Sequence, residues 1–215
     1  MTMQPSSSLS PENTIVVFDI HGVLFKRNYK KTMNLLWQNK KVVLLARYML
    51  HPRFMYDLCT LMLKRAVPEE CIMTLCQKYP GIATYKHLAI NIANAQDPIQ
   101  ETLDIVSCLK KRGYVLHIFS NIGAVIFVHL AARHQAIFSN FDAVQVPNQE
   151  NSYLAKNNPK AFAHYLATYN QHNKTILFID DNRQNIRRAT DAGMISIYFE
   201  NPDQLRNKLT QFDLL

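Results

Sequence analysis

Five short apolar segments with strand character recur along this chain of 215 residues, and helical patterns separate them. The strands are predicted at about residues 14–19, 115–119, 143–146, 175–179 and 195–199. Helices are expected at Pro98–Arg112, Gly123–Gln135, Lys160–Asn170, Arg183–Ala192 and residues 203–212. Strands that alternate with helices indicate a parallel sheet with both faces covered, so we predict an α/β fold of Rossmann-like architecture.

Carboxylates follow two of these predicted strands. The first strand leads to Asp19, and Gly22 shortly after it permits a sharp turn. A later strand leads to the adjacent acids Asp180 and Asp181. A buried carboxylate without a partner is costly and adjacent acids repel each other, so a divalent cation is expected beside them. Because ligands bind at the carboxyl ends of strands in such sheets, Asp19 is a candidate nucleophile or metal ligand.

A hydroxyl and a lysine complete the set of candidate site residues. Ser120 and Asn121 follow the strand at 115–119, where the hydroxyl and a backbone N–H could donate to an anionic oxygen. Such residues are also common turn formers. Lys156 or Lys160 could neutralise the carboxylates, and the Lys-x-x-Pro-x-x-Phe spacing that begins at Lys156 favours the former.

A carboxylate, a hydroxyl, a lysine and an acid pair in this order resemble the four motifs of the haloacid dehalogenase superfamily. The resemblance runs from about Ile15 to Phe199, omitting a variable insert, and its most specific part is the segment 178–186. That segment looks like the fourth motif of the subgroup that contains sugar-phosphate phosphatases and the N-terminal phosphatase domain of epoxide hydrolases. The resemblance therefore implies a hydrolase, and most directly a phosphatase that uses Mg²⁺.

The resemblance also implies roles for individual residues. Asp19 would attack phosphorus and form an aspartyl-phosphate. The metal would be held by Asp19, Asp181 and the backbone carbonyl of His21, while Asp180 would bind it through water or brace Lys156. The implied catalytic residues are Asp19, His21, Ser120, Asn121 and Lys156.

One position departs from the phosphatase pattern, which usually has Asp-x-Asp where this chain has Asp19-Ile20-His21. In the family the second Asp protonates the leaving group and then activates water. An imidazole has an unperturbed pKa of about 6.5, so His21 could give and take a proton near neutrality. Two other interpretations stay open: a weakly active or non-catalytic protein that binds or regulates, and a dehalogenase-like hydrolase that attacks carbon and needs no metal.

The insert between the first and second motifs, residues 26–96, has apolar residues at helical spacing, as at Leu58, Leu61 and Met62. Its place matches that of the helical C1 cap of the resembled family, which closes over the active site and selects the substrate. The remaining residues, 14–25 and 97–215, would form the Rossmann-like core. The sequence does not identify the substrate or the oligomeric state.

The segment Lys26–Asp97 carries twelve basic and four acidic residues, which accounts for the whole net charge of +8. A solvated helical face would explain this charge. The sharper alternative is that this charge attracts an anionic, phosphorylated small-molecule substrate, or contacts nucleic acid or an acidic membrane surface.

The N-terminal residues 1–13 are rich in Ser and Pro and predict a disordered lead without a secretory apolar region. No transmembrane segment is expected, since the apolar stretch Val42–Leu50 is far shorter than the roughly 20 residues that a span needs. The four cysteines lack C-x-x-C spacing, so a zinc site is not expected. Free cysteines and the absence of a signal peptide favour the cytoplasm, and secretion without a cleavable signal stays open.

Overall fold

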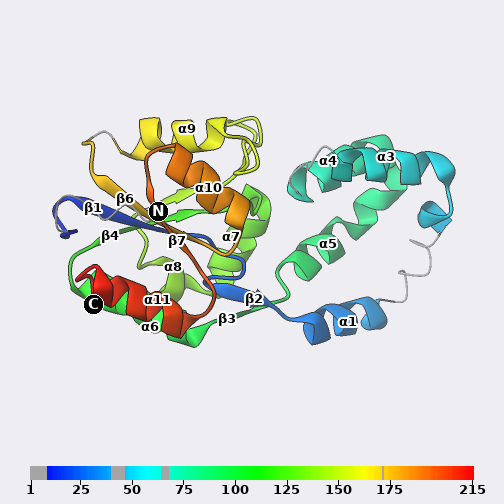
Figure 1. The fold of residues 1–215 in the computed structure, drawn as a ribbon. Helices are drawn as coiled ribbons and strands as arrows, with labels where there is room; N and C mark the ends of the chain where they lie inside the picture. Colours follow the sequence, from blue (N-terminus) through cyan, green and yellow to red (C-terminus); the bar gives the residue numbers. More distant parts are fainter. Residues whose placement is uncertain (1–8, 40–46, 64–67, 171) are drawn as a thin grey trace.

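A five-stranded parallel sheet forms the centre of the protein in the computed structural model, which describes residues 9–39, 47–63, 68–170 and 172–215 (Figure 1). The order of the strands in the sheet is β5-β4-β1-β6-β7, and every neighbouring pair is parallel. Their bounds are Thr14–Phe18 for β1, Val115–Phe119 for β4, Ala143–Gln145 for β5, Thr175–Asp180 for β6 and Ile195–Tyr198 for β7. The predicted α/β Rossmann-like fold is confirmed.

The sheet is buried on both faces because alternate side chains of each strand point to opposite sides. In β1, Val16 and Phe18 belong to one hydrophobic cluster, and Ile15 and Val17 belong to the other. The strand β6 alternates in the same way. Near-continuous apolar strands of this kind are typical of parallel sheets that are enclosed by helices.

Helices cover both faces of the sheet (Figure 1). The helices α6 and α11 contribute buried side chains to the cluster on one face, and α9 and α10 contribute theirs to the other. The bounds of the core helices are Gln100–Lys111 for α6, Ala124–Arg133 for α7, Gln135–Phe138 for α8, Lys160–Tyr169 for α9, Arg183–Asp191 for α10 and Pro202–Gln211 for α11. The single helix expected at Gly123–Gln135 is divided, because the backbone of His134 leaves the helical region at φ −130° and ψ 42°.

Two expectations from the sequence need correction. The segment 26–96 is not helical to its ends, since β2 (Phe25–Arg27) and β3 (Gln96–Pro98) form an antiparallel pair at its base. These strands are too short to show alternation. The disordered lead expected through residue 13 is wrong for residues 9–13: Leu9 is buried in the core, and its carbonyl accepts a hydrogen bond of 3.3 Å from the Tyr114 hydroxyl. Residues 1–8 lie outside the described part.

The residues between β2 and β3, 28–95, are called the cap below. Its described elements are α1 (Tyr29–Gln38), α3 (Pro52–Leu63), α4 (Pro68–Lys78), the 3₁₀ helix η1 (Pro80–Tyr85) and α5 (Lys86–Ala93). The cap has a small apolar core of its own around Phe54, Leu75 and Ile82. Figure 1 shows it beside the sheet, where α4 and α5 contact α7 of the core. None of the described helices is long and apolar enough to cross a membrane.

Candidate active site

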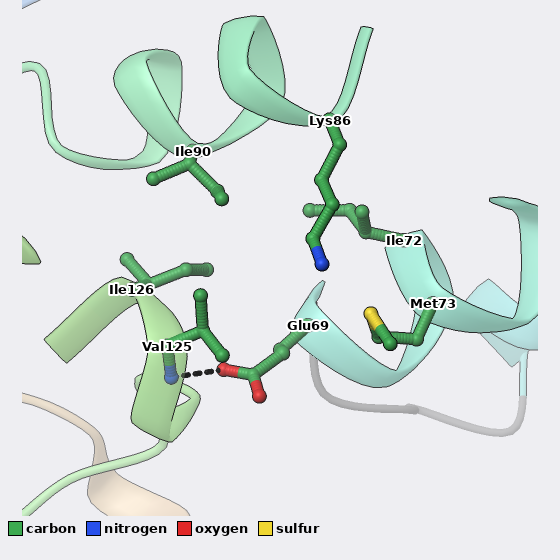
Figure 2. A pocket seen from close by; sticks show the side chains of 7 residues that line it. All are labelled: Glu69, Ile72, Met73, Lys86, Ile90, Val125 and Ile126. Atoms are coloured by element: carbon green, nitrogen blue, oxygen red, sulfur yellow. Dashed lines mark hydrogen bonds between the residues drawn. The ribbon is translucent and has the colours of Figure 1, made fainter. Parts of the chain in front are cut away.

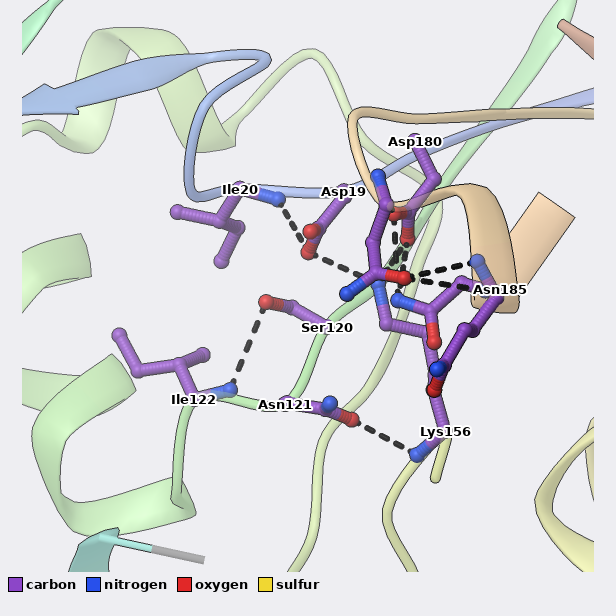
Figure 3. A network of polar contacts seen from close by, with 10 residues as sticks. Asp19, Ile20, Ser120, Asn121, Ile122, Lys156, Asp180 and Asn185 are labelled. Carbon is purple, nitrogen blue, oxygen red and sulfur yellow. Dashed lines mark hydrogen bonds and ion pairs between the residues drawn. The ribbon is translucent and has the colours of Figure 1, made fainter. Parts of the chain in front are cut away.

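The carboxyl ends of β1, β4 and β6 bring the predicted site residues together (Figure 3). Phe18 is paired with Ile118 on β4 and with Ile179 on β6. Asp19 therefore lies beside Asp180, the last residue of β6. The backbone N–H of Asp19 donates to the Ile179 carbonyl at 3.0 Å, which continues the ladder one residue past β1. The side chain of Asp19 is nearly buried, and its Oδ1 accepts a hydrogen bond of 2.7 Å from the N–H of Ile20.

Lys156 lies at the centre of the site and is 1% exposed. Its Nζ lies 3.0 Å from Oδ1 of Asp19 and 2.5 Å from Oδ2 of Asp180. Burial lowers the pKa of this ammonium, but the two carboxylates outweigh burial and raise the pKa above its usual value. The loop before Lys156 is tied to the second predicted motif, because the Lys156 N–H donates to the side-chain oxygen of Asn121 at 2.7 Å.

Asp180 is completely buried, and burial raises its pKa to about 6 against the opposing effect of Lys156. Both of its carboxylate oxygens accept hydrogen bonds of 3.1 Å from Nδ2 of Asn185, and one accepts a further bond of 2.8 Å from the N–H of Asn182. With all these partners Asp180 is a fixed anchor for Lys156. We assigned no role to Asn185 from the sequence. Its position one helical turn into α10, behind the acid pair, is the signal that could have found it.

The three carboxylates of the site can converge on one cation. Ligand oxygens of Asp19, Asp180 and Asp181 all lie within 4.8 Å of one another. Asp181 is exposed, and burial of part of its side chain together with the charge of Asp19 raises the pKa of its carboxyl. Gly22 gives the Asp181 carboxylate its space: a Cβ at Gly22 would lie 2.0 Å from Oδ2 of Asp181. Oxygen donors of this kind fit Mg²⁺.

Ser120 is buried at the end of β4, on the side of Asp19 away from Asp180 (Figure 3). Its backbone N–H donates to the Gln145 carbonyl at 3.0 Å, which fixes the position of the residue. Among the described residues, its Oγ makes one long contact of 3.4 Å, with the N–H of Ile122. The hydroxyl is therefore free to donate to an oxygen of a bound anion.

His21 is partly buried next to this group of charges. Burial lowers the pKa of its imidazole, and the positive charges of Arg27 and Lys156 lower the pKa further. The negative charge of Asp19 raises the pKa, but by less than burial lowers it. The neutral imidazole is therefore the main form at neutral pH, and it can accept a proton. Lys160, the competing lysine, is exposed at the start of α9 and outside this group.

No protein-family model and no curated protein matches the sequence. Solved structures do match the fold. The Bacillus subtilis protein YfnB, described as a HAD-hydrolase bound to magnesium, superposes with a TM-score of 0.62 and 16% identity over 92% of this chain and 99% of that one. A predicted HAD-like family hydrolase from Porphyromonas gingivalis superposes with a TM-score of 0.61 and 22% sequence identity over 93% of this chain and 98% of that one. The fold is that of the haloacid dehalogenase superfamily.

The haloacid dehalogenase fold includes enzymes with different chemistry. The L-2-haloacid dehalogenase of Xanthobacter autotrophicus, with chloropropionic acid covalently bound, matches with a TM-score of 0.57 and 16% identity over 94% of this chain and 84% of that one. At these identities the likeness establishes the fold. The reaction has to be argued from the side chains of the site.

Proposed function

We propose that this protein is a hydrolase of phosphate esters that depends on Mg²⁺ and uses Asp19 as its nucleophile. The observation that carries the proposal is the buried Lys156 ammonium between Asp19 and Asp180, beside a third carboxylate on Asp181. A lysine held in this way places a positive charge 3.0 Å from an oxygen of the nearly buried Asp19 carboxylate. An ionised, oriented carboxylate is the form that attacks an electrophile.

In the first step an oxygen of Asp19 forms a bond to phosphorus, and the bond from phosphorus to the ester oxygen breaks. The leaving oxygen takes a proton, for which the protonated form of His21, the minor form at neutral pH, is the nearby donor. In the second step water attacks the phosphoryl group on Asp19, and His21 accepts the proton of that water. Inorganic phosphate and the Asp19 carboxylate are then released, and His21 is again protonated.

The remaining residues hold the transferring group. Lys156 and the hydroxyl of Ser120 lie on different sides of Asp19, where they can bind the non-bridging oxygens as charge develops on them. Asp19, Asp181 and the His21 carbonyl would hold Mg²⁺, with Asp180 behind them. When bound, Mg²⁺ neutralises carboxylate and phosphoryl charge and so allows the two anions to approach.

A dehalogenase-like reaction at carbon is the second candidate, because His21 stands where phosphatases have Asp and because the Xanthobacter dehalogenase shares the fold. The grouping of three carboxylates favours the phosphatase, because attack on carbon needs no metal. Among the described residues only Lys156 forms ion pairs with these carboxylates, so a cation is expected beside them. The third candidate is a protein that binds a ligand but catalyses no reaction on it.

The test compares two substrates with and without Mg²⁺. We expect hydrolysis of p-nitrophenyl phosphate that requires Mg²⁺ and is lost in Asp19→Asn, since an amide cannot form the acyl-phosphate. Asp191→Asn, which changes an exposed carboxylate at the end of α10, is the matched control and should retain activity. Metal-independent chloride release from 2-chloropropionate would establish the second candidate instead. If the folded wild type catalyses neither reaction, the third candidate, a protein that binds without catalysis, is favoured.

A further inference from the structure

An exposed apolar stripe runs along α1, the first helix of the cap. Tyr29, Met33 and Trp37 are exposed by 71%, 60% and 89%. They follow one another at intervals of four residues, so they lie on one side of the helix over about 12 Å. We call these three residues the α1 stripe. A helix that packs onto a protein normally turns its apolar side inward, whereas the α1 stripe is turned to solvent.

The opposite side of α1 faces the rest of the protein. Lys31, Asn34 and Gln38 line the hollow between α1 and the core. The Lys31 ammonium is paired with the Asp97 carboxylate of β3, and α1 packs against α5 at the edge of the cap (Figure 1). Because the polar side of α1 is the one held in place, the α1 stripe is directed away from the protein.

Exposed basic residues border the α1 stripe. Lys30 is on the adjoining side of α1, and Lys26 and Arg27 lie on β2 just before the helix. None of these three residues forms an ion pair with a described residue. Their charges are therefore available to an anionic partner that contacts the α1 stripe.

The same combination recurs farther along the cap. Met49 and Leu50 are exposed, and the exposed Arg47 and Arg53 flank them in the sequence. The large apolar side chains that are exposed in the described residues all belong to the cap, except two valines of α7. Exposed apolar groups and unpaired cations thus gather in the same part of the protein.

The acidic residues of the segment Lys26–Asp97 do not offset this charge. Two of the four are already paired, Asp57 with Lys78 and Asp97 with Lys31. A third, Glu69, is buried and accepts a hydrogen bond from the N–H of Val125. The outward surface of the cap is therefore positive, and such a surface attracts anions.

This combination restricts what can cover the α1 stripe. A second copy of the chain on the same surface would bring two positive surfaces together, which is unfavourable. A nucleic acid would match the charge, but the aliphatic side chains of Met33, Met49 and Leu50 offer no ring on which a base can stack. An acidic membrane matches both properties, because apolar and aromatic side chains enter the headgroup region while lysine and arginine stay at the charged surface.

We propose that the cap binds reversibly to the surface of a membrane that contains acidic lipids, with α1 lying flat in the interface. The α1 stripe enters the headgroup region, and Lys26, Arg27 and Lys30 pair with lipid phosphates. The carboxylates of the proposed catalytic site take no part in this binding. It is therefore independent of the reaction at Asp19.

Trp37 reports this binding directly, because it is the only tryptophan of the chain. When full-length protein meets vesicles of phosphatidylcholine and phosphatidylserine, its fluorescence maximum should shift to shorter wavelength and the protein should sediment with the vesicles. Vesicles of phosphatidylcholine alone should cause neither change. Added salt should weaken the binding, because it screens the attraction between the basic residues and the lipids.

Single variants separate the apolar contribution from the charge. Met33→Gln should weaken vesicle binding about tenfold, because one apolar side chain no longer enters the interface. Lys30→Gln should weaken it about fivefold, the effect of one basic residue near an acidic membrane. The matched controls are Val128→Gln, an exposed apolar residue of α7, and Lys160→Gln, an exposed lysine of the core. Both should bind as the wild type does.

The result is separable from the proposed reaction, because Asp19→Asn should bind vesicles as the wild type does. Tyr29→Gln gives the same comparison if circular dichroism shows that Met33→Gln is unfolded. The proposal is overturned if acidic vesicles leave the Trp37 spectrum unchanged, if phosphatidylcholine alone gives the same response, or if the α1 variants bind unchanged. It is also overturned if the shift appears without vesicles as the protein concentration rises, which indicates a second copy, or with a single-stranded oligonucleotide alone.

Discussion

The Glu69 carboxylate, on α4 of the cap, accepts a hydrogen bond of 2.7 Å from the backbone N–H of Val125, in the first turn of α7 in the core (Figure 2). Glu69 is 7% exposed, and a Cβ at Gly123 would lie 2.2 Å from its Oε2. The first N–H groups of a helix lack partners within it, and the helix dipole favours an anion there. The cap is thus attached to the core immediately after the Ser120 motif.

Removing this contact should release the cap. We expect Glu69→Ala to lose a charge-assisted hydrogen bond worth about 1.5–3 kcal/mol and to speed exchange of the Val125 amide hydrogen. Gly123→Ala should do the same by steric conflict. Glu70→Ala, at the neighbouring position on α4, serves as the control. Unchanged exchange at Val125 in Glu69→Ala would show that the apolar contacts around it hold the cap without the carboxylate.

Asp181 should control the response to metal. Millimolar Mg²⁺ should raise Tm of the wild type through mass action, and Asp181→Ala should abolish the increase, because a ligand that is absent cannot contribute binding energy. Gly22→Ala should also reduce it: a methyl group there displaces the Asp181 carboxylate, and the backbone has φ +81°. Asp191→Ala is the control. A wild-type Tm that does not change with Mg²⁺ would contradict the assignment of Asp181 as a metal ligand.

Lys156 should matter for stability as well as for activity. Lys156→Met leaves Asp19 and Asp180 buried without a counter-charge, and breaking such a buried pair typically costs about 3–5 kcal/mol. We expect this loss in urea unfolding, with partial recovery in the double variant that adds Asp180→Asn. The exposed Lys160→Met should change the free energy of unfolding by less than about 0.5 kcal/mol. Equal effects at both lysines would contradict the proposed arrangement.

The role of His21 can be tested through the leaving group. A proton donor matters most when the departing oxygen is strongly basic, so His21→Ala should lower kcat/KM for an alkyl phosphate by about 10²–10⁴-fold. The loss should be much smaller for p-nitrophenyl phosphate, whose leaving group needs little protonation. His21→Asp should retain or increase activity. Equal losses for both esters would show that His21 does not act as the acid.

Asp142 should make stability depend on acid pH. Burial raises the pKa of its carboxyl, but hydrogen bonds from Lys110 Nζ and the Leu116 N–H outweigh burial, so its folded pKa is below the ordinary value of 3.8. Its contribution is therefore complete above about pH 4 and is lost as the pH falls through the folded pKa. Because 41% of its side chain is exposed, Asp142→Asn should cost about 1 kcal/mol or less. The difference between wild type and variant should vanish in denaturation curves near pH 2.

Much of the fold could be predicted because strands such as Val115–Phe119 are apolar and are followed by polar groups at the sheet edge. The pairing of β2 with β3 could not be predicted, because each strand has three residues and is too short to show the alternation of apolar and polar side chains. The ordering of Leu9 was missed for a different reason. The Leu9 carbonyl accepts a hydrogen bond from Tyr114, more than a hundred residues away, and the Leu9 side chain is buried in the core. The composition of the lead shows neither contact.

In the candidate site, the motif positions Asp19, Ser120 and Asp180 could be predicted because each lies at the carboxyl end of a strand. The contacts between motifs could not. Asn121 was expected to offer its backbone, yet its side chain holds the Lys156 loop. The contact between the cap and α7 could not be predicted either, because no local sequence pattern shows that Glu69 is buried against Val125.

The central position of β1 has a consequence for how this protein can change. β1 is hydrogen-bonded to β4 on one side and to β6 on the other, and Asp19 follows it directly. Core strands of this kind are expected to open least often. The cap is joined by the two short strands β2 and β3 and meets α7 through α4 and α5. Mutations in the cap can therefore accumulate without loosening the carboxylates. Under the proposed function, variation in the cap would change the contacts to the substrate while the reacting groups keep their positions.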